Sequence, residues 1–178
     1  MWRDAGHIAL TAGIAGGADV ILIPEIPYNI NSIAKKIAAV KAGGRNFALV
    51  VVSEAIKTLE GDMSQTKFSD GQLRYGGIGH YIGDQISRAT GSETRVTVLG
   101  HVQRGSSPTY NDRLLASAFG VRAVDLIAEG KFDRMVAWKN REVVDVPIEA
   151  AIAANQVVDV NSSLVHTARA LGISLGDD

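Results

Sequence analysis

Three side chains able to bind an anion stand close together in the sequence. Arg95 begins a stretch in which Val96 and Val98 alternate with polar residues, as a partly buried strand requires. His101 and Arg104 follow in a segment rich in glycine, serine and proline. The end of a strand opening into a loop is where parallel sheets place their ligand sites. Because guanidinium and imidazole groups donate hydrogen bonds, the pattern favours a phosphate or carboxylate ligand.

The same segment resembles the substrate-phosphate loop of 6-phosphofructokinases. The residues that match in order and spacing are Arg95, Gly100, His101, Gln103, Arg104, Gly105 and Pro108. The resemblance implies that His101 and Arg104 hold the 6-phosphate of fructose 6-phosphate, while Arg95 reaches in from a neighbouring subunit. A planar guanidinium suits this role because it can make two parallel bonds to phosphate oxygens. Without the resemblance, a surface ion pair of Arg95 with Glu93 is an equal alternative.

The first six residues resemble the start of a helix in the same family. There the resemblance implies that Met1 contacts the sugar and that Arg3 faces the transferring phosphoryl group, where an arginine stabilises the transition state by neutralising its oxygens. The first turn of a helix also offers free N–H groups to an anion. Trp2 replaces the family's glycine, so a flexible terminal arginine is the alternative, and we expect residues 1–3 to be displaced or poorly ordered.

Glu54 ends an apolar stretch that resembles the strand leading to the family's sugar-binding glutamate. A carboxylate that accepts from sugar hydroxyls discriminates against analogues lacking them, because it is then left unpaired. The alternative is a solvated charge at a strand end. Asp19 and Arg45 lie where regulated bacterial members bind a nucleotide diphosphate. Because glycines stand at 43 and 44, where lysines would be needed, we expect that effector site to be absent or altered.

Composition excludes several classes of function. The 178 residues carry a net charge of −1, so there is no general attraction to nucleic acid or to an anionic membrane. No apolar run approaches the ~20 residues of a membrane helix. The absence of cysteine excludes disulfides and thiolate metal sites. The histidines lack partners at metal-ligand spacing, so we expect no metal site. Nothing opposes a cytoplasmic location.

Hydrophobic periodicity predicts alternating helices and strands. Helices are expected at residues 8–15, 33–40, 78–89, 111–129, 148–154 and 162–171, and strands at 20–23, 47–52, 95–99, 135–138 and 142–146. Repeated strand–helix–strand units indicate an α/β fold with a mostly parallel sheet and flanking helices. The resemblance makes this a phosphofructokinase-like three-layer sandwich, incomplete relative to the family. The long irregular stretch at residues 55–76 is typical of a functional or mobile loop.

The resemblance also assigns parts of the chain. Residues 1–100 correspond to part of the small, sugar-phosphate-binding domain, residues 101–147 return to the large domain, and residues 148–178 form C-terminal helices. The chain thus corresponds to the C-terminal part of the family's usual length. The donor-binding loops and the general base would lie in the part that precedes it, so we expect these residues alone to be inactive.

The reaction implied by the resemblance is phosphorylation of fructose 6-phosphate to fructose 1,6-bisphosphate in glycolysis. ATP would be the donor, with Mg²⁺ bound mainly by the preceding part, and the full-length enzyme would be a homodimer or homotetramer. A pyrophosphate-dependent enzyme is the first alternative, because residues 60–63 and 75–79 resemble the branch that contains such members. A non-catalytic sugar-phosphate-binding module or an interaction domain is the second.

Overall fold

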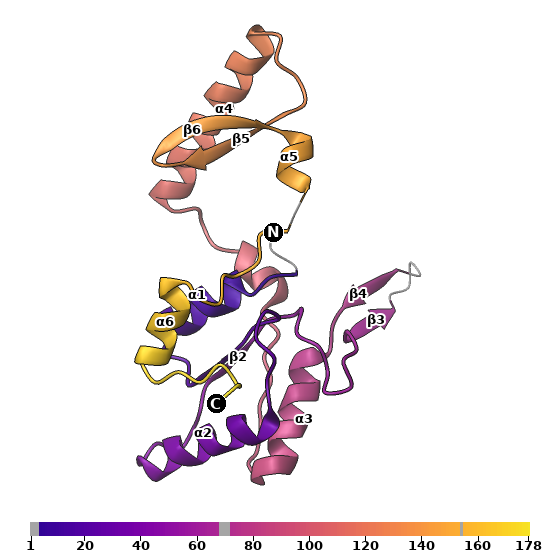
Figure 1. Cartoon of the computed structure of the whole chain (residues 1–178), viewed down its shortest axis with the longest axis vertical. Coiled ribbons are helices and arrows are strands. Elements are labelled where there is room, and N and C mark those ends of the chain that lie inside the picture. Colours follow the sequence, from indigo (N-terminus) through magenta and orange to yellow (C-terminus); the bar gives the residue numbers. More distant parts are fainter. Residues whose placement is uncertain (1–3, 68–71, 154) are drawn as a thin grey trace. The chain divides into compact units, whose positions relative to one another are not determined.

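The computed structural model describes residues 4–67, 72–153 and 155–178, with the backbone alone at positions 66, 67, 73, 74, 101 and 104. The chain divides into two compact units (Figure 1). Unit 1 contains the residues up to 98 together with residues 156–178, and unit 2 contains residues 99–155. Within the described residues, no helix has the length and apolar character needed to cross a bilayer.

Unit 1 is built on a short parallel sheet of β1 (Val20–Leu22) and β2 (Val50–Val52). Val20 lies opposite Val50 and Leu22 opposite Val52. Ser174 forms an isolated parallel bridge with Val20. All of β1 is buried, as expected for a continuous apolar strand covered on both faces. The strand expected at residues 47–52 is thus shorter, because Phe47 and Leu49 lie exposed before β2 begins.

One face of this sheet is covered by α1 (His7–Ala15) and α6 (Ser163–Ala170), which lie side by side (Figure 1). The buried cluster on this side contains Leu10 of α1, Ile21 of β1 and Val165 of α6. These three side chains are at most 1% exposed, so they form the centre of this layer.

The opposite face is covered by α2 (Ile30–Ala42) and α3 (Ile78–Thr90), which pack against each other. Here Val20 and Leu22 join Ile33 of α2 and Ile82 of α3 in a second buried cluster. Successive strand residues point to opposite faces, which is why β1 contributes to both clusters. The result is a three-layer α/β arrangement with flanking helices, and the expected fold class is confirmed.

The segment around Arg95 differs from the prediction, because residues 92–99 form no strand. Instead, Val96 packs on α3 at two glycines: a Cβ added at Gly79 or Gly83 would lie 3.2 or 3.0 Å from it. Thr94 Oγ1 also donates to the Gly83 carbonyl at 3.3 Å. Thr94 and Val96 therefore pack on a helix surface rather than in a strand ladder, whereas Val98 is 70% exposed.

The long stretch that sequence left irregular contains an antiparallel hairpin. It consists of β3 (Gln65–Lys67) and β4 (Leu73–Tyr75), with Gln65 opposite Tyr75. Just beyond the hairpin, the Gly76 N–H donates to the Ser64 carbonyl at 3.1 Å, and Ser64 Oγ donates to the Gly76 carbonyl at 2.6 Å. These contacts close the base of the hairpin next to the start of α3.

Unit 2 has a simpler order: η1 (Gly100–Arg104), α4 (Tyr110–Ala128), β5 (Arg134–Lys139), β6 (Glu142–Pro147) and α5 (Ile148–Ile152). The strands β5 and β6 pair antiparallel through a turn at Asn140 and Arg141, whose φ angles are 52° and 68°. Two such left-handed residues are typical of a tight hairpin turn.

The helix α4 begins with a capping box, in which the side chains of Thr109 and Asp112 each accept from the other's backbone N–H. An ion pair of 2.6 Å joins Arg122 of α4 to Asp145 of β6, and Asp145 also pairs with Arg134 of β5. This network fastens the helix to the hairpin within unit 2.

Candidate functional site

Glu54 occupies the corner of a tight turn that directly follows β2. The Ser53 N–H donates to the Leu22 carbonyl at 2.9 Å, and the Ile56 N–H closes the turn onto the Ser53 carbonyl at 3.3 Å. Ser53, Ala55 and Ile56 are buried, whereas Glu54 is exposed. The apolar neighbours thus anchor the turn and present the carboxylate at the carboxyl end of a parallel strand, where such sheets bind ligands.

The segment after this turn is held by two tyrosines that sequence reasoning did not single out. Tyr28, which precedes α2, donates its hydroxyl to the Lys57 carbonyl at 2.9 Å. Tyr81 of α3 accepts from the Leu59 N–H at 3.1 Å and donates to Glu60 Oε2 at 2.9 Å. The stretch expected to be functional or mobile is therefore attached to α3 and to the segment just before α2.

Arg95 is paired with Glu93, its Nε donating to Oε1 at 3.1 Å. The two side chains are 87% and 76% exposed, which is the surface ion pair left open by the sequence. An exposed pair of this kind contributes little to stability and gives way easily to a competing anion. The guanidinium is consequently accessible from solvent.

His101 and Arg104 lie on η1, in unit 2, whereas Arg95 lies in unit 1. Gly100 adopts a φ of 43°, in the left-handed region where a glycine is least strained. The Val102 N–H donates to the Leu99 carbonyl at 3.0 Å, giving the short-period turn of a 3₁₀ helix. Since that helix has three residues per turn, the backbone places positions 101 and 104 on the same side of it.

Met1 and Arg3 lie outside the described residues. The described chain begins at Asp4, whose Oδ1 accepts a hydrogen bond of 2.7 Å from the Tyr75 hydroxyl. Residues 4 and 75 are thereby joined across a long separation in sequence. This hydrogen bond connects β4 with the residues that precede α1.

Glu25 holds the start of α1 from the carboxyl end of β1. Its carboxylate accepts the Gly6 N–H at 3.0 and 3.1 Å and the Val158 N–H at 2.8 Å. A carboxylate at a helix N-terminus is stabilised by the helix dipole. A Cβ added at Gly6 would lie 2.3 Å from the Ile23 Cβ, so only glycine fits there. Sequence reasoning missed Glu25, because no local pattern indicates contacts this far apart.

The two residues considered for an effector site satisfy each other. The Arg45 guanidinium forms an ion pair with the Asp19 carboxylate, which also accepts the Leu49 N–H at 2.8 Å. Arg45 additionally lies 4.9 Å from the centre of the Phe47 ring. Both side chains are thus engaged within unit 1, and the expected change in the effector site stays a prediction.

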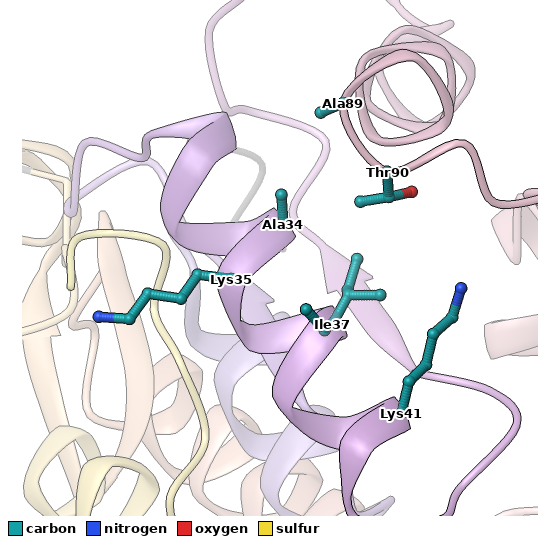
Figure 2. A pocket seen from close by; sticks show the side chains of 7 residues that line it. Ala34, Lys35, Ile37, Lys41, Ala89 and Thr90 are labelled. Carbon is teal, nitrogen blue, oxygen red and sulfur yellow. The ribbon is translucent and has the colours of Figure 1, made fainter.

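A groove of about 400 Å³ runs between α2 and α3. Figure 2 shows Ala34, Ile37 and Lys41 of α2 on the side of Ala89 and Thr90 of α3, while Lys35 extends away from them. None of the predicted site residues lines it. Among the described residues, no group of three or more His, Asp or Glu side chains is placed to hold a metal ion.

Comparison with known proteins decides the family. The family model described as phosphofructokinase matches residues 1–127. The chain belongs to the phosphofructokinase family. The resemblance inferred from the phosphate loop is thereby confirmed.

Relatives with high identity are named phosphofructokinases that use ATP. The ATP-dependent 6-phosphofructokinase 1 of Synechocystis sp. (strain ATCC 27184 / PCC 6803 / Kazusa) is 62% identical over 178 residues, which are 100% of this chain and 49% of the relative. The ATP-dependent 6-phosphofructokinase of Chloroflexus aggregans (strain MD-66 / DSM 9485) is 47% identical, again over 100% of this chain and 49% of its own length. The chain spans about half the length of the curated relatives it matches.

Solved phosphofructokinases share the fold. Phosphofructokinase from Pichia pastoris in the T-state matches 96% of this chain and 17% of its own, with a TM-score of 0.67 and 27% identity. Pyrophosphate-dependent phosphofructokinase from Nitrosospira multiformis matches 97% of this chain and 46% of its own, with a TM-score of 0.70 and 21% identity. The second likeness bears on the fold alone.

Proposed function

We propose that this chain contributes the fructose 6-phosphate site of a 6-phosphofructokinase. The enzyme would move a phosphoryl group from ATP to the 1-hydroxyl of fructose 6-phosphate, giving fructose 1,6-bisphosphate in glycolysis. The observation that carries this proposal is the 62% identity, along the whole chain, to a relative named ATP-dependent 6-phosphofructokinase 1. The phosphate-loop residues and the exposed Glu54 at a strand end support it.

The proposed roles follow from the chemistry of each side chain. His101 and Arg104 would hold the 6-phosphate, with Arg95 supplied by a neighbouring subunit, because phosphate oxygens need several charged donors. Glu54 would accept from the sugar hydroxyls. Met1 would contact the sugar, and Arg3 would neutralise the oxygens of the group in transfer, which is the main task in phosphoryl-transfer catalysis.

The identity of the donor is inferred from the relatives. Those that are 46–62% identical carry names beginning with ATP-dependent. The pyrophosphate-dependent proteins enter as structural neighbours at 20–21% identity. ATP is therefore the donor we propose, and pyrophosphate is the alternative that the assay below tests directly.

Metal, assembly and location complete the proposal. Mg²⁺ would accompany the phosphoryl donor. A homodimer or homotetramer follows from the role given to Arg95, since a neighbouring copy must supply it.

Residues 1–100 would belong to the small domain and residues 101–147 to the large one, followed by C-terminal helices at residues 148–178. A cytoplasmic enzyme fits the glycolytic role.

A chimera tests the proposal. The 178 residues replace the matched part of the Synechocystis relative, and phosphorylation of fructose 6-phosphate is assayed with Mg²⁺ and either ATP or pyrophosphate. We expect turnover with ATP, and none from the 178-residue chain alone. A folded chimera that binds fructose 6-phosphate without turnover would instead support the non-catalytic module. A folded chimera that binds none would overturn the proposal.

A further inference from the structure

We propose that Tyr81, together with Tyr28, is a positioning residue for Glu54: the two hydroxyls fix the loop at residues 57–62 and so hold the Glu54 turn in the orientation that receives the sugar. The inference rests on the role proposed above for Glu54. Tyr28, Glu54, Tyr81 and the loop at residues 57–62 all lie in unit 1, within the part of the chain that the structure describes.

Tyr81 binds the tip of the loop by two different bonds. Its oxygen accepts the Leu59 N–H at 3.1 Å while its hydroxyl donates to Glu60 Oε2 at 2.9 Å. The ring packs against the buried cluster between α2 and α3. The pKa of Glu60 is lowered by hydrogen bonds from its own backbone, from Tyr81 and from Thr58. The carboxylate therefore stays ionised at neutral pH and remains an acceptor for Tyr81.

Tyr28 binds the beginning of the same loop. Its hydroxyl donates to the Lys57 carbonyl at 2.9 Å, three residues after Glu54. Burial, with added repulsion from Tyr81 and Glu60, raises the pKa of Tyr28 to about 12. The phenol therefore keeps its proton, and its hydrogen bond to the Lys57 carbonyl, at neutral pH.

The loop closes on itself between these two attachments. The Thr58 N–H donates to the Asp62 carbonyl at 2.8 Å, and the Gly61 N–H to the Thr58 carbonyl at 3.0 Å. Lys57 and Met63 form an antiparallel bridge. These hydrogen bonds make residues 57–63 a single connected loop. The bonds from Tyr28 and Tyr81 to this loop therefore also restrain the Glu54 turn that precedes it.

Burial alone could also fix the Glu54 turn, because Ala55 and Ile56 are only 4% and 1% exposed. If they alone fix the turn, the tyrosine hydroxyls have no effect on Glu54. The substitution Tyr81→Phe separates these cases, because it removes the hydroxyl and leaves the packed ring in place.

The first measurement uses the 178-residue chain and follows amide hydrogen exchange. We expect Tyr81→Phe to speed exchange at Leu59 and to leave the β1 amides unchanged. Tyr110→Phe is the matched control, because Tyr110 is 78% exposed and lies in unit 2. Unchanged exchange at Leu59 would overturn the inference at its first step.

The second measurement is a double-mutant cycle in the active chimera. Tyr81→Phe should raise KM for fructose 6-phosphate about two- to tenfold, the range for one hydrogen bond, with kcat within about twofold. In a Glu54→Gln background the same substitution should add no further rise, because its effect passes through Glu54. Tyr28→Phe should behave alike.

The outcomes separate the two proposals. An unsubstituted chimera without fructose 6-phosphate binding overturns the proposed function, and this inference with it. If the chimera turns over but Tyr81→Phe leaves KM unchanged, or raises it equally in both backgrounds, the positioning role alone is overturned.

Discussion

Arg45 and Asp19 form an ion pair that is open to solvent on one side only: the arginine side chain is 43% exposed and the aspartate 9%. The aspartate precedes β1, and the arginine lies between α2 and β2. The Asp19 carboxylate also accepts the Leu49 N–H at 2.8 Å, so the pair joins the entrances of both strands of the sheet.

Replacing Arg45 should therefore destabilise unit 1. Arg45→Ala leaves a nearly buried carboxylate with one backbone donor, and unmet hydrogen bonding of that kind costs about 1–3 kcal/mol. The urea midpoint of the β1 and β2 amide signals should fall accordingly. An unchanged midpoint would show that water replaces the guanidinium without loss.

Arg95→Ala is the matched control for stability and a test of binding. Since Arg95 and Glu93 are both largely exposed, their pair contributes ~0–1 kcal/mol, and the midpoint should barely move. In the chimera the same substitution should raise KM for fructose 6-phosphate by about tenfold or more, because a bond to a charged group is worth ~1.5–3 kcal/mol. An unchanged KM would remove Arg95 from the proposed site.

Gly6→Ala should disrupt the start of α1. The new methyl group would lie 2.3 Å from the Ile23 Cβ and 2.8 Å from Glu25 Oε2, so it would push the helix from the carboxylate that holds it. Overpacking of this kind costs about 1–3 kcal/mol. We expect a lower thermal midpoint and faster exchange of the Gly6-region amides.

Gly120→Ala is the opposite case and serves as the control for Gly6. Gly120 lies inside α4, and nothing lies within 4 Å of an added Cβ. Alanine in a helix interior is favoured over glycine by about 1 kcal/mol, so unit 2 should become more stable. Destabilisation at both glycines would argue against steric exclusion as the reason for Gly6.

Acid should loosen unit 2 through Asp145. Hydrogen bonds from Arg122 and then Arg134 hold the pKa of Asp145 below its ordinary 3.8. A carboxyl whose pKa is lower in the folded chain stabilises the fold at neutral pH, and this contribution is lost as the pH falls through the folded pKa. The β5 and β6 amide signals should therefore weaken below about pH 4.

Asp145→Asn should remove part of that acid response. The amide carries no charge at any pH, so the variant should be less stable at neutral pH and should lose less on acidification. If the variant and the unsubstituted chain lose their hairpin signals in parallel, Asp145 does not govern the transition.

Much of the fold could be predicted from the sequence, because its signals are local. The spacing of Ile33 and Ile37, or of Ile82 and Ile86, indicates one buried face of a helix, and each pair lies in the same core cluster. The strand predicted at Arg95 was wrong for a related reason. An apolar residue between polar neighbours, such as Val96, indicates that its side chain is packed, but not whether it packs in a sheet or on a helix.

The site was less predictable, because its supports are distant in sequence. The position of Glu54 at the end of an apolar strand could be predicted, and its role in binding stays a prediction. Tyr81 could not be predicted, since its partners Leu59 and Glu60 lie about twenty positions away with no pattern linking them. The hydrogen bond from the Val158 N–H to Glu25 joins residues 133 positions apart, so it forms only when the two ends of unit 1 pack together.

The bridge between Val20 and Ser174 has a consequence for synthesis on the ribosome. Residues 99–155 emerge as one uninterrupted piece, whereas unit 1 needs α6 and Ser174, which are translated afterwards. Domains fold as their residues become available, so unit 2 can mature while the β1 edge still waits for its neighbour. In a nascent chain that unpaired strand edge could pair with another chain and so promote aggregation.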